Sequence, residues 1–152
     1  MRWKLLDRIL ELEPGRRAQG AFGVSFEAAT LDRPDGRSVL PRVLALEAIG
    51  ELAAWLFIVS TDFARRPLLG SFEQARLARD LEAGERVRIE CELERLHETA
   101  GRVRGRALVG DELVAEVAGA NCALLALEEL EDPDEVRAEY AALARTNKGG
   151  DA

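Results

Sequence analysis

The chain has 152 residues, a formal net charge of −7 and 47% hydrophobic residues. This length suits one domain, and the apolar content is enough to build a core, which excludes a globally disordered chain. The negative charge argues against general nucleic-acid binding, because neutralising phosphates requires a basic surface. Arginines nevertheless gather in the middle of the chain, where they indicate either a local patch for phosphate or carboxylate groups or a mere preference for arginine over lysine. They are Arg33, Arg37, Arg42, Arg65, Arg66, Arg76 and Arg79.

The sequence gives little indication of a signal peptide, a membrane span or a cofactor site. Residues 1–15 carry acidic side chains and no uninterrupted apolar stretch, so no signal peptide is expected. The apolar run 41–60 is short and interrupted by glutamates, so it is not expected to cross a membrane. Cys91 and Cys122 lie in strand-like stretches away from other metal ligands. We therefore expect buried thiols in a reducing, cytoplasmic compartment, with neither a metal nor a cofactor.

The first elements end in one long helix. Residues 3–13 and 16–26 flank a Pro-Gly pair and are expected to form a short opening element or two strands joined by a turn. Residues 27–40 contain Asp, Pro and Gly in close succession, which indicates a loop. A mostly apolar helix is expected over residues 42–59, after Pro41, because proline is tolerated at a helix start.

The second half reads as antiparallel strands. Residues 61–71 are expected to be a connection, after which apolar residues recur at every second position, the pattern of a half-exposed strand. Strands are expected over 73–79 (where composition also permits a helix), 86–93, 103–109 and 113–127, with turns at 97–102 and 110–111.

The carboxyl-terminal region predicts one more helix. Asp132 is an N-cap candidate and Pro133 fits the first helical position. We therefore divide the chain into a domain over residues 1–130, a helix over 131–146 and a flexible tail over 147–152. One long apolar helix with strands joined by short turns predicts an α+β fold in which a curved antiparallel sheet wraps round the helix.

Glu47 is the residue that says most about function. Beyond Arg42, the run 41–60 carries only two charges, Glu47 and Glu51. A helix that is apolar nearly all round is buried, and a lone buried carboxylate is costly unless something pairs with it, hydrates it or uses it. We therefore expect Glu47 to line a functional cavity or an interface. The alternative is a narrow solvent-facing stripe shared with Glu51, one turn further on.

Four blocks of the chain carry a resemblance to a known family: residues 5–20, 38–53, 73–93 and 101–117. In this order they resemble the opening strand pair, the helix entry and catalytic helix, the strand, Pro-Gly-Asp turn and strand, and the closing hairpin of the (3R)-hydroxyacyl-acyl-carrier-protein dehydratases, which have the hotdog fold. At the helix entry the family usually has P-V-M-P-G-V-L, two residues and then E-A, where this chain has SVLPRVLALEA. The resemblance covers residues 3–126 and leaves out the carboxyl-terminal helix.

The resemblance implies an activity and its partners. Such enzymes remove water from a 3-hydroxyacyl thioester in fatty-acid or polyketide-like synthesis, with the substrate carried by acyl carrier protein or CoA. A histidine acts as the base, a helix carboxylate handles the departing hydroxyl, and a backbone N–H at the helix N-terminus polarises the thioester carbonyl. The site lies across a dimer interface, with an apolar tunnel for the acyl chain. No nucleic acid or membrane partner is implied.

The family's functional residues carry over only in part. Glu47 matches the catalytic carboxylate, six residues after Pro41. Arg33 stands in the register of the family's histidine, Arg42 replaces the glycine whose N–H polarises the carbonyl, and Glu51 replaces a glutamine. The resemblance therefore places Arg33, Arg42, Val43 and Glu51 against the substrate. The chain's only histidine, His97, is expected to be a surface residue.

The missing histidine leaves three hypotheses open. Arginine stays protonated and cannot act as the base, and the loss of a general base typically costs about 10²–10⁴-fold in rate. The first hypothesis is an enzyme of dehydratase type that has diverged or that recruits a histidine from a different partner chain. The chain itself is expected to form a homodimer or a heterodimer with a related hotdog subunit. The second is a non-catalytic hotdog subunit that binds acyl chains or pairs with an active paralogue. The third is a hotdog thioesterase that uses Glu47 to activate water.

Overall fold

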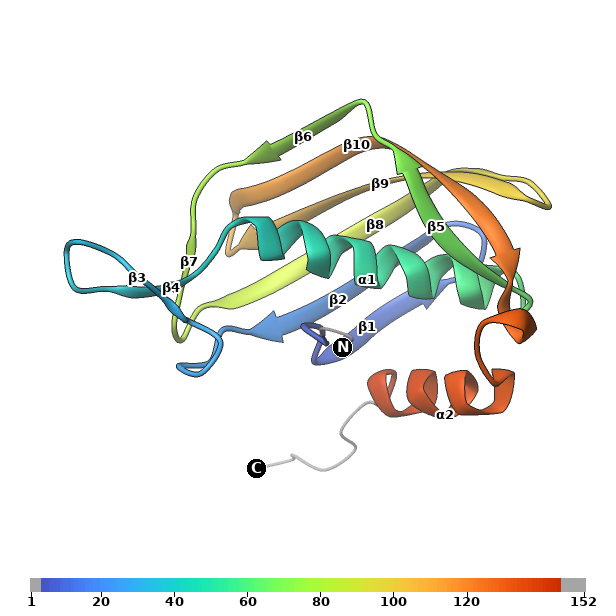
Figure 1. The fold of residues 1–152 in the computed structure, drawn as a ribbon, viewed down its shortest axis with the longest axis horizontal. Coiled ribbons are helices and arrows are strands. Elements are labelled where there is room, and N and C mark those ends of the chain that lie inside the picture. Colours follow the sequence, from blue (N-terminus) through green and yellow to red (C-terminus); the bar gives the residue numbers. More distant parts are fainter. Residues whose placement is uncertain (1–3, 146–152) are drawn as a thin grey trace.

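The computed structural model describes residues 4–145, in which a curved antiparallel sheet carries one long helix across its face (Figure 1). The helix is α1, Val43–Ser60, and the strand order is β1-β2-β8-β9-β10-β5, with β6 also pairing with β10. The strands are β1 Arg8–Glu13, β2 Arg17–Gly23, β5 Arg65–Ser71, β6 Gln74–Leu77, β8 Arg86–Leu96, β9 Ala100–Val109 and β10 Glu112–Ala126. This confirms the predicted α+β arrangement of a sheet wrapped round an apolar helix.

Helix α1 lies close to the sheet because β9 presents glycines to it. A Cβ atom on Gly105 would collide with Ile49, and one on Gly101 would collide with the ring of Phe57. The side chains of Leu52, Leu56, Phe57 and Ile58 are essentially fully buried. The apolar character of the helix therefore reflects its place in the core.

Length and composition alone would also allow α1 to cross a membrane. Its mean hydropathy is 1.9 over 18 residues, and it is the one such helix within residues 4–145. Half of the helix is buried inside the fold. The buried half of the helix packs against the sheet as part of the core.

The outer face of the sheet is held by ion pairs between neighbouring strands. Glu90 stands directly opposite Arg106, and Glu92 directly opposite Arg104, across the β8–β9 pairing. The corresponding N–O distances are both 2.6 Å. The inward residues of β8, by contrast, are buried, which confirms the alternation seen in the sequence.

Two predicted irregular regions are partly strand. Residues 61–71 are not only a connection, because β5 occupies Arg65–Ser71 and pairs with β10. This strand was not predicted because Pro67 and Gly70 read as turn residues, although an edge strand tolerates both. The predicted loop 27–40 contains the hairpin β3 Leu31–Asp32 and β4 Ser38–Leu40. Strand β4 pairs with β7, Leu81–Glu82, in a separate small sheet.

The carboxyl-terminal helix is present as α2, Pro133–Leu143, and the Asp132 side chain caps it by accepting from the Asp134 N–H at 2.9 Å. Tyr140 packs on the rings of Trp55 and Phe63, with centroid distances of 5.8 and 5.9 Å. The helix thus covers the end of α1 (Figure 1). The predicted tail, 147–152, lies outside the described residues.

Candidate functional site

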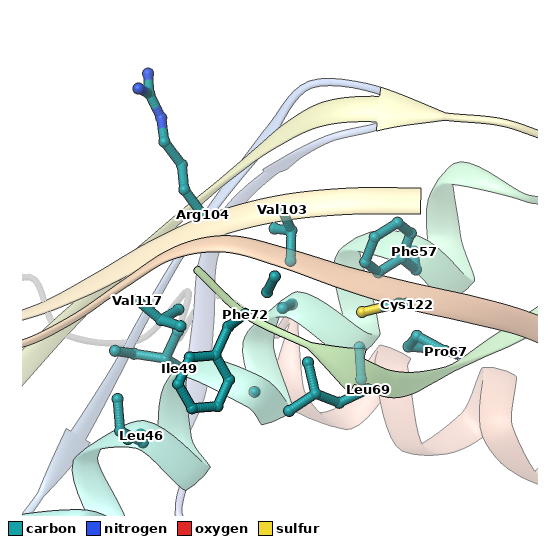
Figure 2. Close-up of a pocket in the computed structure, with 14 residues that line it drawn as sticks. Leu46, Ile49, Phe57, Pro67, Leu69, Phe72, Val103, Arg104, Val117 and Cys122 are labelled. Atoms are coloured by element: carbon teal, nitrogen blue, oxygen red, sulfur yellow. The ribbon is translucent and has the colours of Figure 1, made fainter. Parts of the chain in front are cut away.

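An apolar pocket of about 240 Å³ lies between α1, β5, β9 and β10. Its wall is formed by Leu46, Ile49, Gly50, Ala53, Ala54, Phe57, Pro67, Leu69, Phe72, Val103, Arg104, Val117, Ala120 and Cys122. Figure 2 shows apolar side chains gathered round the cavity, whereas the Arg104 guanidinium points away from it. A lining with almost no polar group suits a hydrocarbon chain.

Glu47 does not itself line this pocket, but along α1 it stands between two residues that do, Leu46 and Gly50. The side chain is exposed, which corrects the expectation that it is buried. It forms no hydrogen bond or ion pair with another residue of the range 4–145. The physical reason is that no element of the single chain covers the helix face that carries Glu47 and Val43, whose own exposure is 53%.

Glu51 lies in a different environment, although it is only one turn away. Its Oε2 accepts hydrogen bonds from the backbone N–H groups of Leu5 at 3.0 Å and Leu6 at 3.2 Å. Burial of the carboxyl raises its pKa, against the opposing effect of those two N–H groups. Glu51 does not line the pocket, so the structure does not bring the two glutamates into one cavity.

Asp80 is the functional candidate that the sequence did not reveal. Its Oδ1 accepts from the backbone N–H and from Nε of Arg42, both at 3.0 Å. Its Oδ2 accepts from Nη1 of Arg33 at 2.8 Å. These contacts, above all the Arg42 side chain, hold the pKa of the Asp80 carboxyl below its usual range. Thirty-eight residues separate Asp80 from Arg42, so no local pattern relates them.

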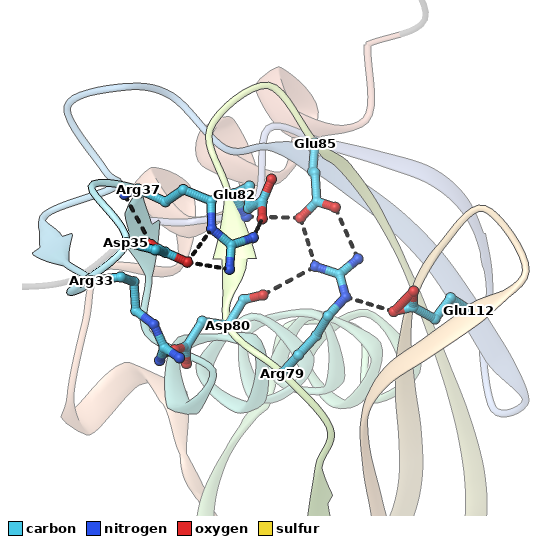
Figure 3. Close-up of polar contacts among 8 residues, drawn as sticks. All are labelled: Arg33, Asp35, Arg37, Arg79, Asp80, Glu82, Glu85 and Glu112. Atoms are coloured by element: carbon cyan, nitrogen blue, oxygen red, sulfur yellow. Dashed lines mark hydrogen bonds and ion pairs between the residues drawn. The ribbon is translucent and has the colours of Figure 1, made fainter.

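Other arginines around this end of α1 are also matched by acids (Figure 3). Arg37 pairs with Asp35 and Glu82. Arg79 donates two hydrogen bonds of 2.9 Å to Glu85 and one of 2.6 Å to Glu112. The arginine cluster is therefore neutralised here, rather than presented as an open anion-binding patch.

The chain supplies no imidazole to this region. His97 is exposed in the β8–β9 hairpin, where its backbone N–H donates to the Ala100 carbonyl at 2.8 Å. It is the only histidine in the sequence. Within residues 4–145, no cluster of His, Cys, Asp and Glu is arranged to hold a metal ion.

Comparison with known proteins decides the family. The 3-hydroxyacyl-acyl-carrier-protein dehydratase FabZ of Pelotomaculum thermopropionicum is 39% identical over 114 residues, which cover 74% of this chain and 81% of that enzyme. FabZ of Symbiobacterium thermophilum is 38% identical, with coverage of 74% and 80%. The chain belongs to the 3-hydroxyacyl-acyl-carrier-protein dehydratase family. No protein-family model matches it.

Solved structures confirm the hotdog fold of this dehydratase-family chain. The smu.793 protein of Streptococcus mutans, bound to acetyl CoA, superposes with a TM-score of 0.64 at 9% identity, covering 83% of this chain and 93% of that one. The thioesterase HI1161 of Haemophilus influenzae gives a TM-score of 0.60 at 10% identity, with 81% of each chain covered. At such identities the likeness concerns the fold alone.

Proposed function

We propose that this dehydratase-family chain binds the acyl group of a 3-hydroxyacyl or enoyl thioester in the apolar pocket and contributes Glu47 to its dehydration. The observation that carries the proposal is the position of Glu47 between two residues that line the pocket, Leu46 and Gly50. An acyl chain in the pocket would leave its polar thioester end near the margin, where the only carboxylate of the exposed helix face stands.

The reaction needs one carboxylate and one base. Dehydration removes a proton from C2 and the hydroxyl from C3, forms the C2–C3 double bond and releases water. Glu47 is the group that would protonate the departing hydroxyl, or hold the attacking water in the reverse direction. The arginine side chain has no acceptor atom for the proton, and His97 lies in the β8–β9 hairpin, so the base is assigned to a second chain.

Exposed apolar residues beside the pocket support such a second chain. Leu68, Leu69 and Phe72 are 59%, 56% and 48% exposed. Strand β5 is also the last strand in the sheet order, and no other strand within residues 4–145 pairs with its outer edge. We propose that a partner covers this surface. A second copy of this chain would place another arginine in the register of the family's base, whereas a related hotdog subunit with a histidine in the register of Arg33 would supply the base.

The carrier and the compartment follow from the proposed reaction. The substrate would be an acyl thioester of acyl carrier protein or CoA in fatty-acid or polyketide-like synthesis, within the cytoplasm. Neither a nucleic acid nor a membrane takes part in it.

A second candidate is a non-catalytic acyl-binding subunit. The observation that favours it is the ion pair between Arg33 and Asp80, which places a fixed cation in the register of the family's base. A thioesterase that activates water with Glu47 is the third candidate. It would need neither a histidine nor an active paralogue.

The experiment measures hydration of enoyl thioesters and dehydration of 3-hydroxyacyl thioesters, using the chain alone and mixed with a histidine-bearing paralogue. We expect turnover above that of the paralogue only in the mixture, with loss of this gain in Glu47→Gln. Glu135→Gln, which alters an exposed acid on α2, is the matched control. Acyl binding without any gain would favour the non-catalytic subunit, and thiol release by the chain alone would favour the thioesterase.

A further inference from the structure

The N-terminus of α1 receives its carboxylate from a distant segment. The N-cap, Arg42, makes no side-chain cap hydrogen bond, and the first turn of α1 contains no acidic residue. Asp80, which lies between β6 and β7, takes the N-cap's backbone N–H instead, at 3.0 Å. The Asp80 side chain is only 11% exposed, so this is an enclosed contact and not a passing surface interaction.

We infer that Asp80 occupies the place of the thioester carbonyl at the helix N-terminus and must be displaced before a substrate carbonyl can be polarised there. Asp80 would thus be a positioning residue that controls access to the Arg42 N–H. The inference rests on the proposed function, because it assumes that an acyl thioester enters the neighbouring pocket.

The Asp80 carboxylate should bind the Arg42 N–H more strongly than a substrate thioester carbonyl does. A backbone N–H makes one good hydrogen bond, and a carboxylate is a stronger acceptor than a neutral thioester carbonyl. The positive end of the helix dipole also prefers an anion. In addition, Nε of Arg42 and Nη1 of Arg33 bind the same carboxylate, at 3.0 and 2.8 Å. A thioester carbonyl can therefore accept from the Arg42 N–H only after the Asp80 carboxylate has broken its hydrogen bonds with that N–H, with Arg42 Nε and with Arg33 Nη1.

This arrangement gives Arg33 a role that is independent of proton transfer. Arg33 holds Asp80 from the side of the β3–β4 hairpin, while Arg42 holds it from the helix. The residue in the register of the family's base would then keep the carbonyl site closed.

The test compares two ligands that differ only in the carbonyl oxygen, the dodecanoyl thioester and the dodecyl thioether of N-acetylcysteamine. Their dissociation constants are measured with the full chain and with Asp80→Ala. We expect the variant to bind the thioester about tenfold tighter, the equivalent of one hydrogen bond, with thioether binding unchanged. Glu82→Gln is the control, because it removes a carboxylate that pairs with Arg37 and not with the helix.

An unchanged ratio of thioester to thioether affinity in Asp80→Ala would overturn the inference, as would the same shift in Glu82→Gln. Asp80→Asn keeps the side-chain volume and should show a smaller change in the same direction if the alanine variant folds poorly. Failure of both ligands to bind wild-type protein would count against the proposed function. The Arg42 amide still tests the protection by Asp80 in that case, because its hydrogen exchange should accelerate at least tenfold in Asp80→Ala, which removes the acceptor oxygen. An equal exchange rate in the two proteins would refute it.

Discussion

Glu51 accepts a hydrogen bond of 3.0 Å from the backbone N–H of Leu5 and thereby fastens the amino-terminal segment to the middle of α1. A second bond, from the N–H of Leu6, reaches the same oxygen at 3.2 Å. Leu6 is itself a buried core residue. The second carboxylate of the apolar helix therefore has a structural use that is separate from the pocket.

Two replacements of Glu51 should distinguish the effect of its charge on stability from the effect of its hydrogen bonds. Glu51→Ala leaves two N–H groups without their acceptor and should lower the free energy of unfolding by about 1–3 kcal/mol. Glu51→Gln keeps an acceptor oxygen without the buried charge and should be at least as stable as wild type near neutral pH. Urea denaturation of the three proteins measures this difference. Equal losses in both variants would show that the hydrogen bonds contribute nothing.

The same pair of variants predicts a pH dependence. Burial raises the pKa of Glu51 above its ordinary value of 4.5, so the folded chain binds this proton more tightly than the unfolded chain. The contribution of Glu51 to stability is therefore fully present below pH 4.5 and falls as the pH rises through the higher folded-state pKa. Glu51→Gln should lack this decline, so the difference in stability between it and wild type should grow toward neutral pH. A constant difference would contradict the raised pKa.

Glycines on the sheet and on the helix should respond in opposite ways to alanine. Gly105→Ala forces a Cβ atom against Ile49 and should lower the free energy of unfolding by about 1–3 kcal/mol. Gly50→Ala meets no atom within 4 Å on the exposed helix face and should raise it by about 1 kcal/mol through helix propensity. Thermal and urea unfolding provide the measurement. Destabilisation by Gly50→Ala would show that this face is covered in solution.

Position 50 also offers a matched pair for testing the pocket. Gly50→Phe places a ring at the pocket wall and should weaken binding of the dodecyl thioether about tenfold or more. Gly50→Ala also raises helix propensity, by more than Phe does, while leaving most of the cavity open. Titration calorimetry compares the two variants with wild type. Equal affinities in all three proteins would place the acyl chain elsewhere.

The cysteines report on occupancy of the same pocket. Cys122 lines it and is half-buried, and burial raises the pKa of its thiol, so labelling by maleimide should be slow at neutral pH. Bound dodecyl thioether should slow this labelling further. Cys91 is fully enclosed in the core and should react only after unfolding. Mass spectrometry identifies the labelled residue, with Cys122→Ser as the control. Labelling at Cys122 that is indifferent to ligand would argue against binding beside it.

Restoring catalysis should require two changes at once. Arg33→His supplies an imidazole at the position of the family's histidine, but the Asp80 carboxylate would still accept the hydrogen bond of the Arg42 N–H. We therefore expect the double variant, Arg33→His with Asp80→Ala, to exceed both single variants in enoyl-thioester hydration by about 10²-fold or more. Added Glu47→Gln should remove the gain. Full activity in Arg33→His alone would show that Asp80 yields readily to substrate.

Much of the fold was predictable because it depends on periodicity. The alternation from residue 86 onward predicted strands β8, β9 and β10, and a mostly apolar run predicted α1. Strand β5 escaped prediction because Pro67 and Gly70 carry turn signals, and only pairing with β10 makes this segment a strand. Pairing between distant segments has no local signature.

The sequence by itself determined the core helix, the family and the position of Glu47, because helical spacing and a matched motif are local properties. Tertiary structure alone decided which partner each charge has. It exposes Glu47, turns Glu51 toward the amino-terminal segment, and brings Asp80 to Arg33 and Arg42. The reason is that the free energy of a charge depends on the groups and the solvent within a few ångströms, and residues far apart in the chain supply that environment.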